Sequence, residues 1–183
     1  KALAENGHRV QMWAYEQEVV NAVNNDHENR TYLQGVSLPP GISASTNLQT
    51  VAEGKDYLIL AVPSLYLINV VKQMINVPSV QEGTAPIAIL TKGFIETSTG
   101  PGLLTAAIEN YLPGFYKDNL VYISGPSHAE EVARGKITGL ISASKNPKNS
   151  IQFRELLKGT TLLVFSSLDI IGVQTAAAIK NVI

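Results

Sequence analysis

Two lysines stand where a charged group could take part in chemistry. Lys92 follows the apolar run "PIAILT", and Lys180 lies in the small apolar segment "AAAIKNVI". A lysine at the end of a buried strand can hold a phosphate or polarise a carbonyl. Burial or a neighbouring cation lowers the pKa of a lysine toward neutrality, as general acid–base catalysis requires. The alternative for Lys92 is a solvated surface charge, and for Lys180 a side chain that extends along a helix end to water.

Polar residues also follow two other apolar runs. Tyr15 and Glu16 follow "HRVQMW". In a dinucleotide-binding fold, an acid at the end of the second strand can accept hydrogen bonds from the ribose hydroxyls of the adenosine, and it would repel a 2′-phosphate. The alternative for Glu16 is a first-turn glutamate that the helix dipole favours. After "NLVYIS", the stretch "SGPSHAEEVARG" holds Ser127 and Glu130 at the spacing of a capping box. A helix that begins there would also attract an anion to its N-terminus.

These residues need a scaffold that brings the ends of several strands together. Short runs rich in Val, Ile and Leu predict strands at 8–13, 56–62, 86–91, 119–123, 137–144 and 161–166. Helical patterns lie between them at about 16–25, 64–76, 99–111, 127–134 and 147–158. Asp169 is a candidate N-cap for a last helix at 169–183, whereas the Pro- and Gly-rich stretch 38–46 is expected to be a loop. This alternation predicts an α/β fold with a doubly wound, mostly parallel sheet that binds ligands at the carboxyl ends of its strands.

Composition excludes several classes of protein. The 183 residues carry a formal net charge of -1, so no basic excess indicates a nucleic acid or a membrane surface as partner. There is no cysteine, which excludes disulfides and thiolate metal sites, and the histidines lack the spacing of metal ligands. No apolar run approaches the roughly 20 residues of a membrane span. The phosphate-binding motif G-x-G-x-x-G does not occur either.

Several of these stretches together resemble the bacterial-type NAD(P)-dependent glycerol-3-phosphate dehydrogenase family. The matching segments are "GHRVQMWAYE", "HENRTYL", "AVPS", "TKGFIE", "SGPSHAEEVARG" and "DIIGVQTAAAIKNVI". The resemblance implies a Rossmann-like NAD(P)-binding domain at residues 1–167, followed at 168–183 by the first helix of an all-helical substrate domain. It also leads us to expect that the first strand and its Gly-rich loop lie upstream of Lys1.

The resemblance further implies roles for individual residues. Lys180 matches the catalytic lysine that donates and accepts the proton, and Lys92 matches a second catalytic lysine that contacts substrate and cofactor. The implied substrate contacts are Lys92, Gly125, Ser127, Lys180 and Asn181. The implied cofactor contacts are Tyr15, Glu16, Tyr32, Pro63, Lys92 and Ala129. No metal is implied.

The implied reaction is the reversible reduction of dihydroxyacetone phosphate to sn-glycerol 3-phosphate, in the cytoplasm, to supply phospholipid synthesis. The cofactor is NAD or NADP. Members that use NADPH often carry a basic residue where this chain has Tyr15 and Glu16, so NADH is slightly favoured. A homodimer is compatible with the resemblance. Two alternatives stay open: a dehydrogenase of the 6-phosphogluconate type, and a nucleotide-sensing module in which both lysines are surface charges.

Overall fold

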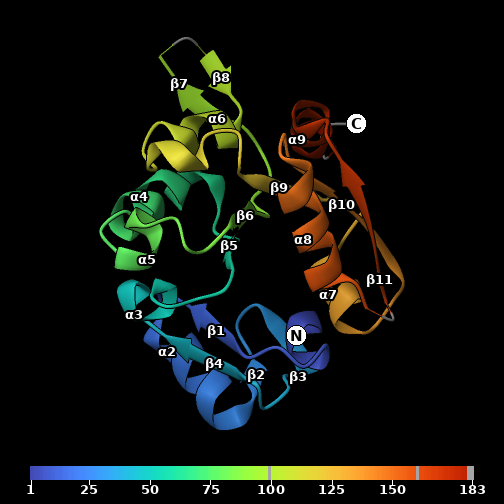
Figure 1. Cartoon of the computed structure of the whole chain (residues 1–183). Helices are drawn as coiled ribbons and strands as arrows, with labels where there is room; N and C mark the ends of the chain where they lie inside the picture. Colours follow the sequence, from blue (N-terminus) through green and yellow to red (C-terminus); the bar gives the residue numbers. More distant parts are fainter. Residues whose placement is uncertain (99, 160, 181–183) are drawn as a thin grey trace.

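The computed structural model describes residues 1–98, 100–159 and 161–180, in which strands and helices alternate (Figure 1). The main sheet has the strand order β11-β10-β9-β6-β5. Its strands are β5 (Leu58–Leu60), β6 (Ile87–Ile89), β9 (Val121–Ser124), β10 (Thr138–Ala143) and β11 (Leu162–Ser167). Neighbours are parallel except β9 and β10, which pair antiparallel. The prediction of a mostly parallel α/β sheet is therefore confirmed.

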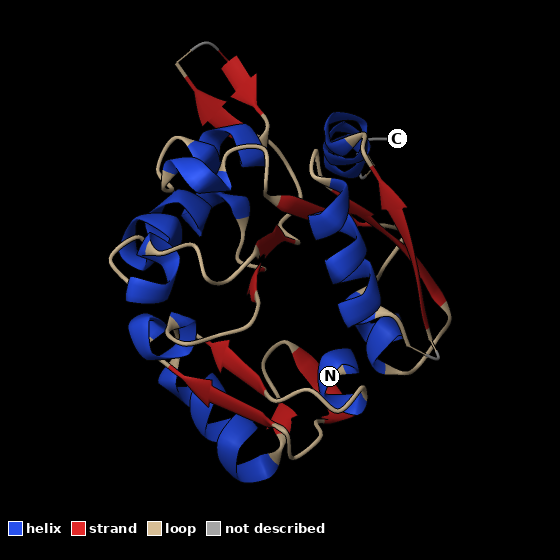
Figure 2. Ribbon diagram, in the orientation of Figure 1, coloured by secondary structure: helices blue, strands red, loops and turns tan. Residues whose placement is uncertain are grey.

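The central strands are buried on both faces, which explains their continuous apolar sequences. Ile87, Ala88 and Ile89 of β6 are at most 1% exposed. Successive side chains of a strand point to opposite faces, so Ile87 and Ile89 enter one core cluster and Ala88 enters another. Helices cover the two faces on either side of the sheet (Figure 2), as a doubly wound fold requires.

The two clusters are closed by different helices. α4 (Ser64–Met74) and α9 (Ile170–Ile179) contribute buried residues to the first cluster. α8 (Pro147–Leu157) contributes Phe153 to the second. Along α4 the buried positions recur every three or four residues, which is the spacing of one helical face.

The remaining elements are short. The helices are α1 (Ala2–Glu5), α2 (Gln17–Asn21) with a π-helical turn (Ala22–Asp26), α3 (Leu48–Ala52), α5 (Pro78–Gln81), α6 (Leu104–Glu109), a 3-10 turn (Gly114–Tyr116) and α7 (Ala129–Ala133). Two antiparallel pairs join β2 (Glu28–Asn29) to β3 (Leu33–Ser37) and β7 (Ile95–Thr97) to β8 (Gly100–Gly102). In the part of the chain that the structure describes, no helix is long and apolar enough to cross a membrane.

A parallel pair of strands lies apart from the main sheet. β1 (Val10–Trp13) pairs with β4 (Ile42–Ser45), and among the described residues neither strand pairs with the five-stranded sheet. Figure 1 places the pair at the bottom of the molecule. β4 shows that the expected loop at 38–46 was wrong in part. Ile42 is buried in a cluster with Val19, and this burial outweighs the turn preference of the neighbouring Pro and Gly.

The helix predicted at 99–111 is shorter than expected. Gly100 and Pro101 belong to β8, and α6 begins only at Leu104. Gly100 has a φ of 112°, a conformation that glycine tolerates and other residues rarely adopt. Proline is excluded from a helix interior because it lacks the backbone donor. Both residues therefore interrupt the helical pattern that the surrounding sequence indicates.

The second core cluster gives a prediction for stability. Phe153→Ala should lower the free energy of unfolding by about 3–5 kcal/mol, because the ring is 0% exposed and packs edge-to-face on Tyr57 at 5.3 Å between centroids. Ile151→Ala on the same helix is the control, since Ile151 is 44% exposed and its loss should cost less than about 1 kcal/mol. Urea unfolding measures both, and equal losses would contradict this anchoring of α8.

Candidate active site

Lys92 lies at the carboxyl edge of the main sheet, just after β6. Its side chain is half-buried, and its Nζ donates a long hydrogen bond of 3.4 Å to the carbonyl oxygen of Gly125. Burial lowers the pKa of Lys92, and the positive charge of Lys180 lowers that pKa further. The structure thus brings the two predicted lysines close enough to interact electrostatically.

Lys180 reaches this edge from the end of α9. The helix packs on β9 and β10, and Lys180 is its C-terminal cap, with its backbone N–H bonded to the carbonyl of Ala176 at 3.1 Å. At the other end, Asp169 Oδ1 accepts a hydrogen bond of 2.8 Å from the N–H of Gly172. The predicted N-cap is therefore confirmed. Asn181, the next predicted site residue, lies outside the described residues.

The backbone just before Lys92 is held by two buried hydroxyls that the sequence reasoning missed. Tyr122, on β9 and 0% exposed, donates to the carbonyl of Thr91 at 2.9 Å. The hydroxyl of Thr91 donates to the carbonyl of Val62 at 2.6 Å. Burial raises the pKa of Tyr122 to about 12, so the phenol stays a neutral donor at pH 7. The only sequence signal was a tyrosine inside an otherwise apolar strand.

Gly125 is required by a close backbone approach as well as by its contact with Lys92. A Cβ at this position would lie 2.3 Å from the carbonyl oxygen of Gly139, a distance that real side chains do not reach. The loop after β9 therefore packs directly on β10. This packing aims the carbonyl of Gly125 at the Lys92 amine.

The capping box expected from Ser127 and Glu130 is wrong. α7 begins at Ala129, its N-cap is His128, and no side chain caps it. The backbone N–H of Ser127 donates to the carbonyl of Gly125 at 2.8 Å. This bond makes a tight turn, and the helix begins one residue later than it would with Ser127 as its N-cap. Ser127 remains beside the carbonyl that Lys92 contacts, whereas Ala129 is exposed.

The predicted cofactor residues Tyr15, Glu16 and Tyr32 gather at the end of β1. Glu16 occupies the N-cap position of α2, and its Oε1 accepts a hydrogen bond of 2.7 Å from the Tyr32 hydroxyl. This carboxylate raises the pKa of Tyr32. Tyr15 is 82% exposed and lines a cavity of about 450 Å³ together with Trp13. Pro63 is exposed at the N-cap of α4.

The amino-acid sequence is similar to those of known proteins. Residues 1–150 match the family described as NAD-dependent glycerol-3-phosphate dehydrogenase N-terminus. The chain belongs to this family. Among the described residues of this family member, no group of three or more His, Asp or Glu side chains could hold a metal ion.

Similar proteins share both sequence and fold with the chain. A glycerol-3-phosphate dehydrogenase (NAD(P)+) of Treponema denticola is 48% identical over 100% of this chain and 53% of its own length. One of Bacillus velezensis is 34% identical over 99% and 51%. The crystal structure of a glycerol-3-phosphate dehydrogenase from Coxiella burnetii superposes with a TM-score of 0.87 at 29% identity, over 99% of this chain and 53% of that one. The chain spans about half the length of the curated relatives it matches.

The proximity of the two lysines can be tested by titration. Lys180→Met should raise the pKa of Lys92, because removal of a nearby positive charge favours the charged form of the amine. NMR titration of ¹³C-labelled lysine side chains measures this shift. Lys180→Arg keeps the charge and is the control, in which the pKa of Lys92 should stay near that of the parent. The same Lys92 pKa in the parent and in Lys180→Met would contradict the proximity.

Proposed function

We propose that the chain forms the cofactor-binding part and part of the catalytic site of an NAD(P)-dependent sn-glycerol-3-phosphate dehydrogenase. The observation that carries the proposal is the pair Lys92 and Lys180 at the carboxyl edge of the sheet, where the charge of one lowers the pKa of the other. Ligands bind at this edge in open α/β sheets. A phosphorylated ketone is anionic and needs both a cation and a proton donor.

The two lysines divide the work at the substrate carbonyl. When bound, the nicotinamide cofactor supplies a hydride to the ketone carbon of dihydroxyacetone phosphate. Lys180 transfers a proton to the carbonyl oxygen as negative charge develops there, and its neutral amine regains a proton from water. Lys92, anchored on the carbonyl of Gly125, orients that oxygen and stabilises the charge electrostatically. Asn181 and Ser127 complete the proposed substrate contacts.

The end of β1 fits the adenosine part of the cofactor. A cavity of about 450 Å³ opens beside Tyr15 and Trp13, and the Glu16 carboxylate is fixed by Tyr32 at 2.7 Å. In this position Glu16 can accept hydrogen bonds from the ribose hydroxyls. Its charge would repel a 2′-phosphate, so we propose a preference for NADH over NADPH. Pro63 and Ala129 are the further cofactor contacts that we propose.

The wider role of the protein follows from its product. We propose that it supplies sn-glycerol 3-phosphate for phospholipid synthesis in the cytoplasm and that it acts as a homodimer. We also propose that residues 1–167 belong to the cofactor domain and residues 168–183 to the first helix of a helical substrate domain. These proposals rest on family membership and on the similarity to glycerol-3-phosphate dehydrogenases that are about twice as long as this chain.

Removal of the proposed proton donor tests the mechanism. Lys180→Ala should lower kcat for dihydroxyacetone phosphate reduction by about 10²–10⁴-fold. Lys148→Ala changes an exposed lysine on α8 and should leave kcat unchanged. Steady-state rates at saturating substrate measure both. Undiminished turnover in Lys180→Ala would refute the role of this lysine, and faster oxidation of hydroxy acids than of glycerol 3-phosphate would favour the 6-phosphogluconate class.

Charge reversal at the adenosine end tests the cofactor preference. Glu16→Arg should raise the NADPH-to-NADH ratio of kcat/KM by about tenfold or more, equivalent to about 1.4 kcal/mol, because repulsion of the 2′-phosphate becomes attraction. Glu18→Arg is the matched control, since Glu18 is an exposed acid in the same helix. The ratio should stay near the parent value in that variant. A similar change in both variants would indicate net charge rather than a contact at Glu16.

A further inference from the structure

α9 carries Lys180, but its own sequence does not define which face is buried. The helix is apolar on nearly all sides: Ile170 and Ala177 are buried, whereas Ile171 and Ile179 are exposed. The hydrophobic effect is non-directional, so apolar burial alone does not select one rotation of this helix on the sheet. Some other contact must fix its rotation.

Gln174 makes that contact. It is 2% exposed, and all of its polar atoms are bonded. Its Oε1 accepts from the backbone N–H of Thr105 at 3.1 Å. Its Nε2 donates to the Thr105 hydroxyl at 2.8 Å and to the carbonyl of Ile170 at 3.1 Å. Two of these bonds connect α9 to a residue that is 69 positions away in the sequence.

The partner of Gln174 is a helix end that lacks a cap of its own. Thr105 lies in the first turn of α6, whose N-cap position is occupied by Leu103 without a capping side chain. The first backbone N–H groups of a helix have no partner inside that helix. Gln174 provides one from α9, so α6 and α9 can lose this contact only by leaving a buried donor unsatisfied.

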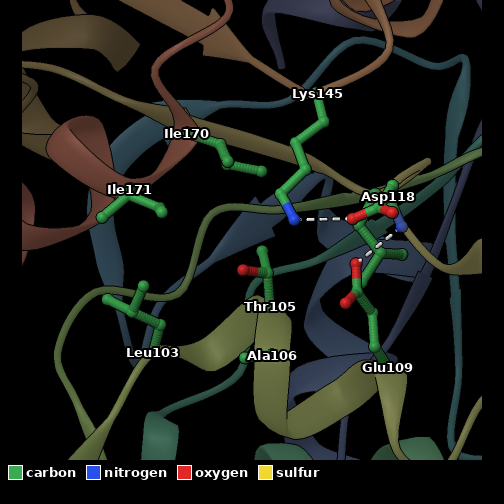
Figure 3. Close-up of a pocket in the computed structure, with 9 residues that line it drawn as sticks. Leu103, Thr105, Ala106, Glu109, Asp118, Lys145, Ile170 and Ile171 are labelled. Atoms are coloured by element: carbon green, nitrogen blue, oxygen red, sulfur yellow. Dashed lines mark hydrogen bonds and ion pairs between the residues drawn. The ribbon is translucent and has the colours of Figure 1, made fainter.

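Apolar packing at the same seam is incomplete. A cavity of about 90 Å³ lies between α6 and the start of α9, lined by Thr105, Ile170 and Ile171 among others. Figure 3 shows these side chains around the space, with the Lys145–Asp118 ion pair beside them. Apolar packing therefore leaves room at this seam, and the directional hydrogen bonds of Gln174 add a constraint on the position of α9.

We propose that Gln174 is a positioning residue for Lys180. It fixes the rotation of α9 about its axis and its position along that axis. Lys180 lies six residues after Gln174, about 9 Å along the helix, and its amine then points to the edge where Lys92 lies. A rotation of about 20° would move a side-chain tip at a helix radius of about 5–6 Å by about 2 Å. Such a displacement is large for catalysis, because a misplacement of about 1 Å can cost about 10²-fold in rate. The inference rests on the proposed function of Lys180.

Gln174→Met tests the inference, because methionine keeps the length and volume of the side chain and removes every hydrogen bond. We expect kcat for dihydroxyacetone phosphate reduction to fall by about 10–100-fold, with an unchanged KM for NADH. Gln174→Glu should recover part of this loss, since a carboxylate still accepts from the Thr105 N–H and hydroxyl. Thr175→Ala is the matched control: among the described residues, the Thr175 hydroxyl bonds only to the carbonyl of Ile171 in its own helix, and kcat should stay at the parent value.

A second readout separates this inference from the proposed reaction. In Gln174→Met the pKa of Lys92 should rise, because Lys180 moves away from it. If the parent protein does not reduce dihydroxyacetone phosphate, the proposed function fails and this titration alone decides the role of Gln174. A folded Gln174→Met protein with the parent's kcat and the parent's Lys92 pKa would overturn the inference.

If Gln174→Met does not fold, a milder variant tests the same inference. Thr105→Val removes one acceptor and keeps the backbone donor, so α9 loses one of its two hydrogen bonds to α6 while α6 itself should still fold. A lower kcat at unchanged cofactor KM in Thr105→Val, with a raised Lys92 pKa, supports the positioning role. Parent values for both quantities in that variant overturn it.

Discussion

Two like charges held at one edge of a sheet are the constraint on which this site depends. Lys92 and Lys180 repel each other, so no attraction between the amines brings them together. The surrounding structure must impose their positions. Tyr122 holds the backbone before Lys92 through Thr91, and Gln174 holds the helix that carries Lys180. The proposed chemistry therefore depends on buried hydrogen bonds outside the site itself.

These hydrogen bonds define geometry more than they add stability. Among the described residues, no buried side-chain nitrogen or oxygen lacks a partner. The net stabilisation from each bond is small, whereas an unsatisfied buried group is costly. An alternative packing of α9 or of the loop after β6 would leave the polar side-chain atoms of Gln174 or Tyr122 buried without a hydrogen-bond partner. The arrangement of the two lysines is thus maintained because other packings would leave buried polar groups unsatisfied. In the same way, a single buried polar residue fixes the register of a coiled coil.

The sequence predicted those features that depend on local pattern. The continuous apolar run that contains Ile87 and Ile89 identified a strand buried on both faces, and Asp169 identified the start of α9. Features that depend on distant contacts could not be predicted. Ile42 lies in a turn-like stretch, and it belongs to a strand because it pairs with β1 and is buried in the cluster with Val19. Gln174 looked like one polar residue in an apolar helix, because its partner Thr105 is far away in the chain.

The two ends of the proposed site differ in charge, and this difference suits the proposed dinucleotide and its substrate. Lys92 and Lys180 make the end near β6 and β9 cationic, which suits a phosphorylated ketone and the charge that develops on its oxygen. Glu16, held by Tyr32, makes the end of β1 anionic, which suits ribose hydroxyls and disfavours an added phosphate. In the proposed function, Glu16 would thus select the cofactor at one end of the site and the two lysines would bind the substrate at the other.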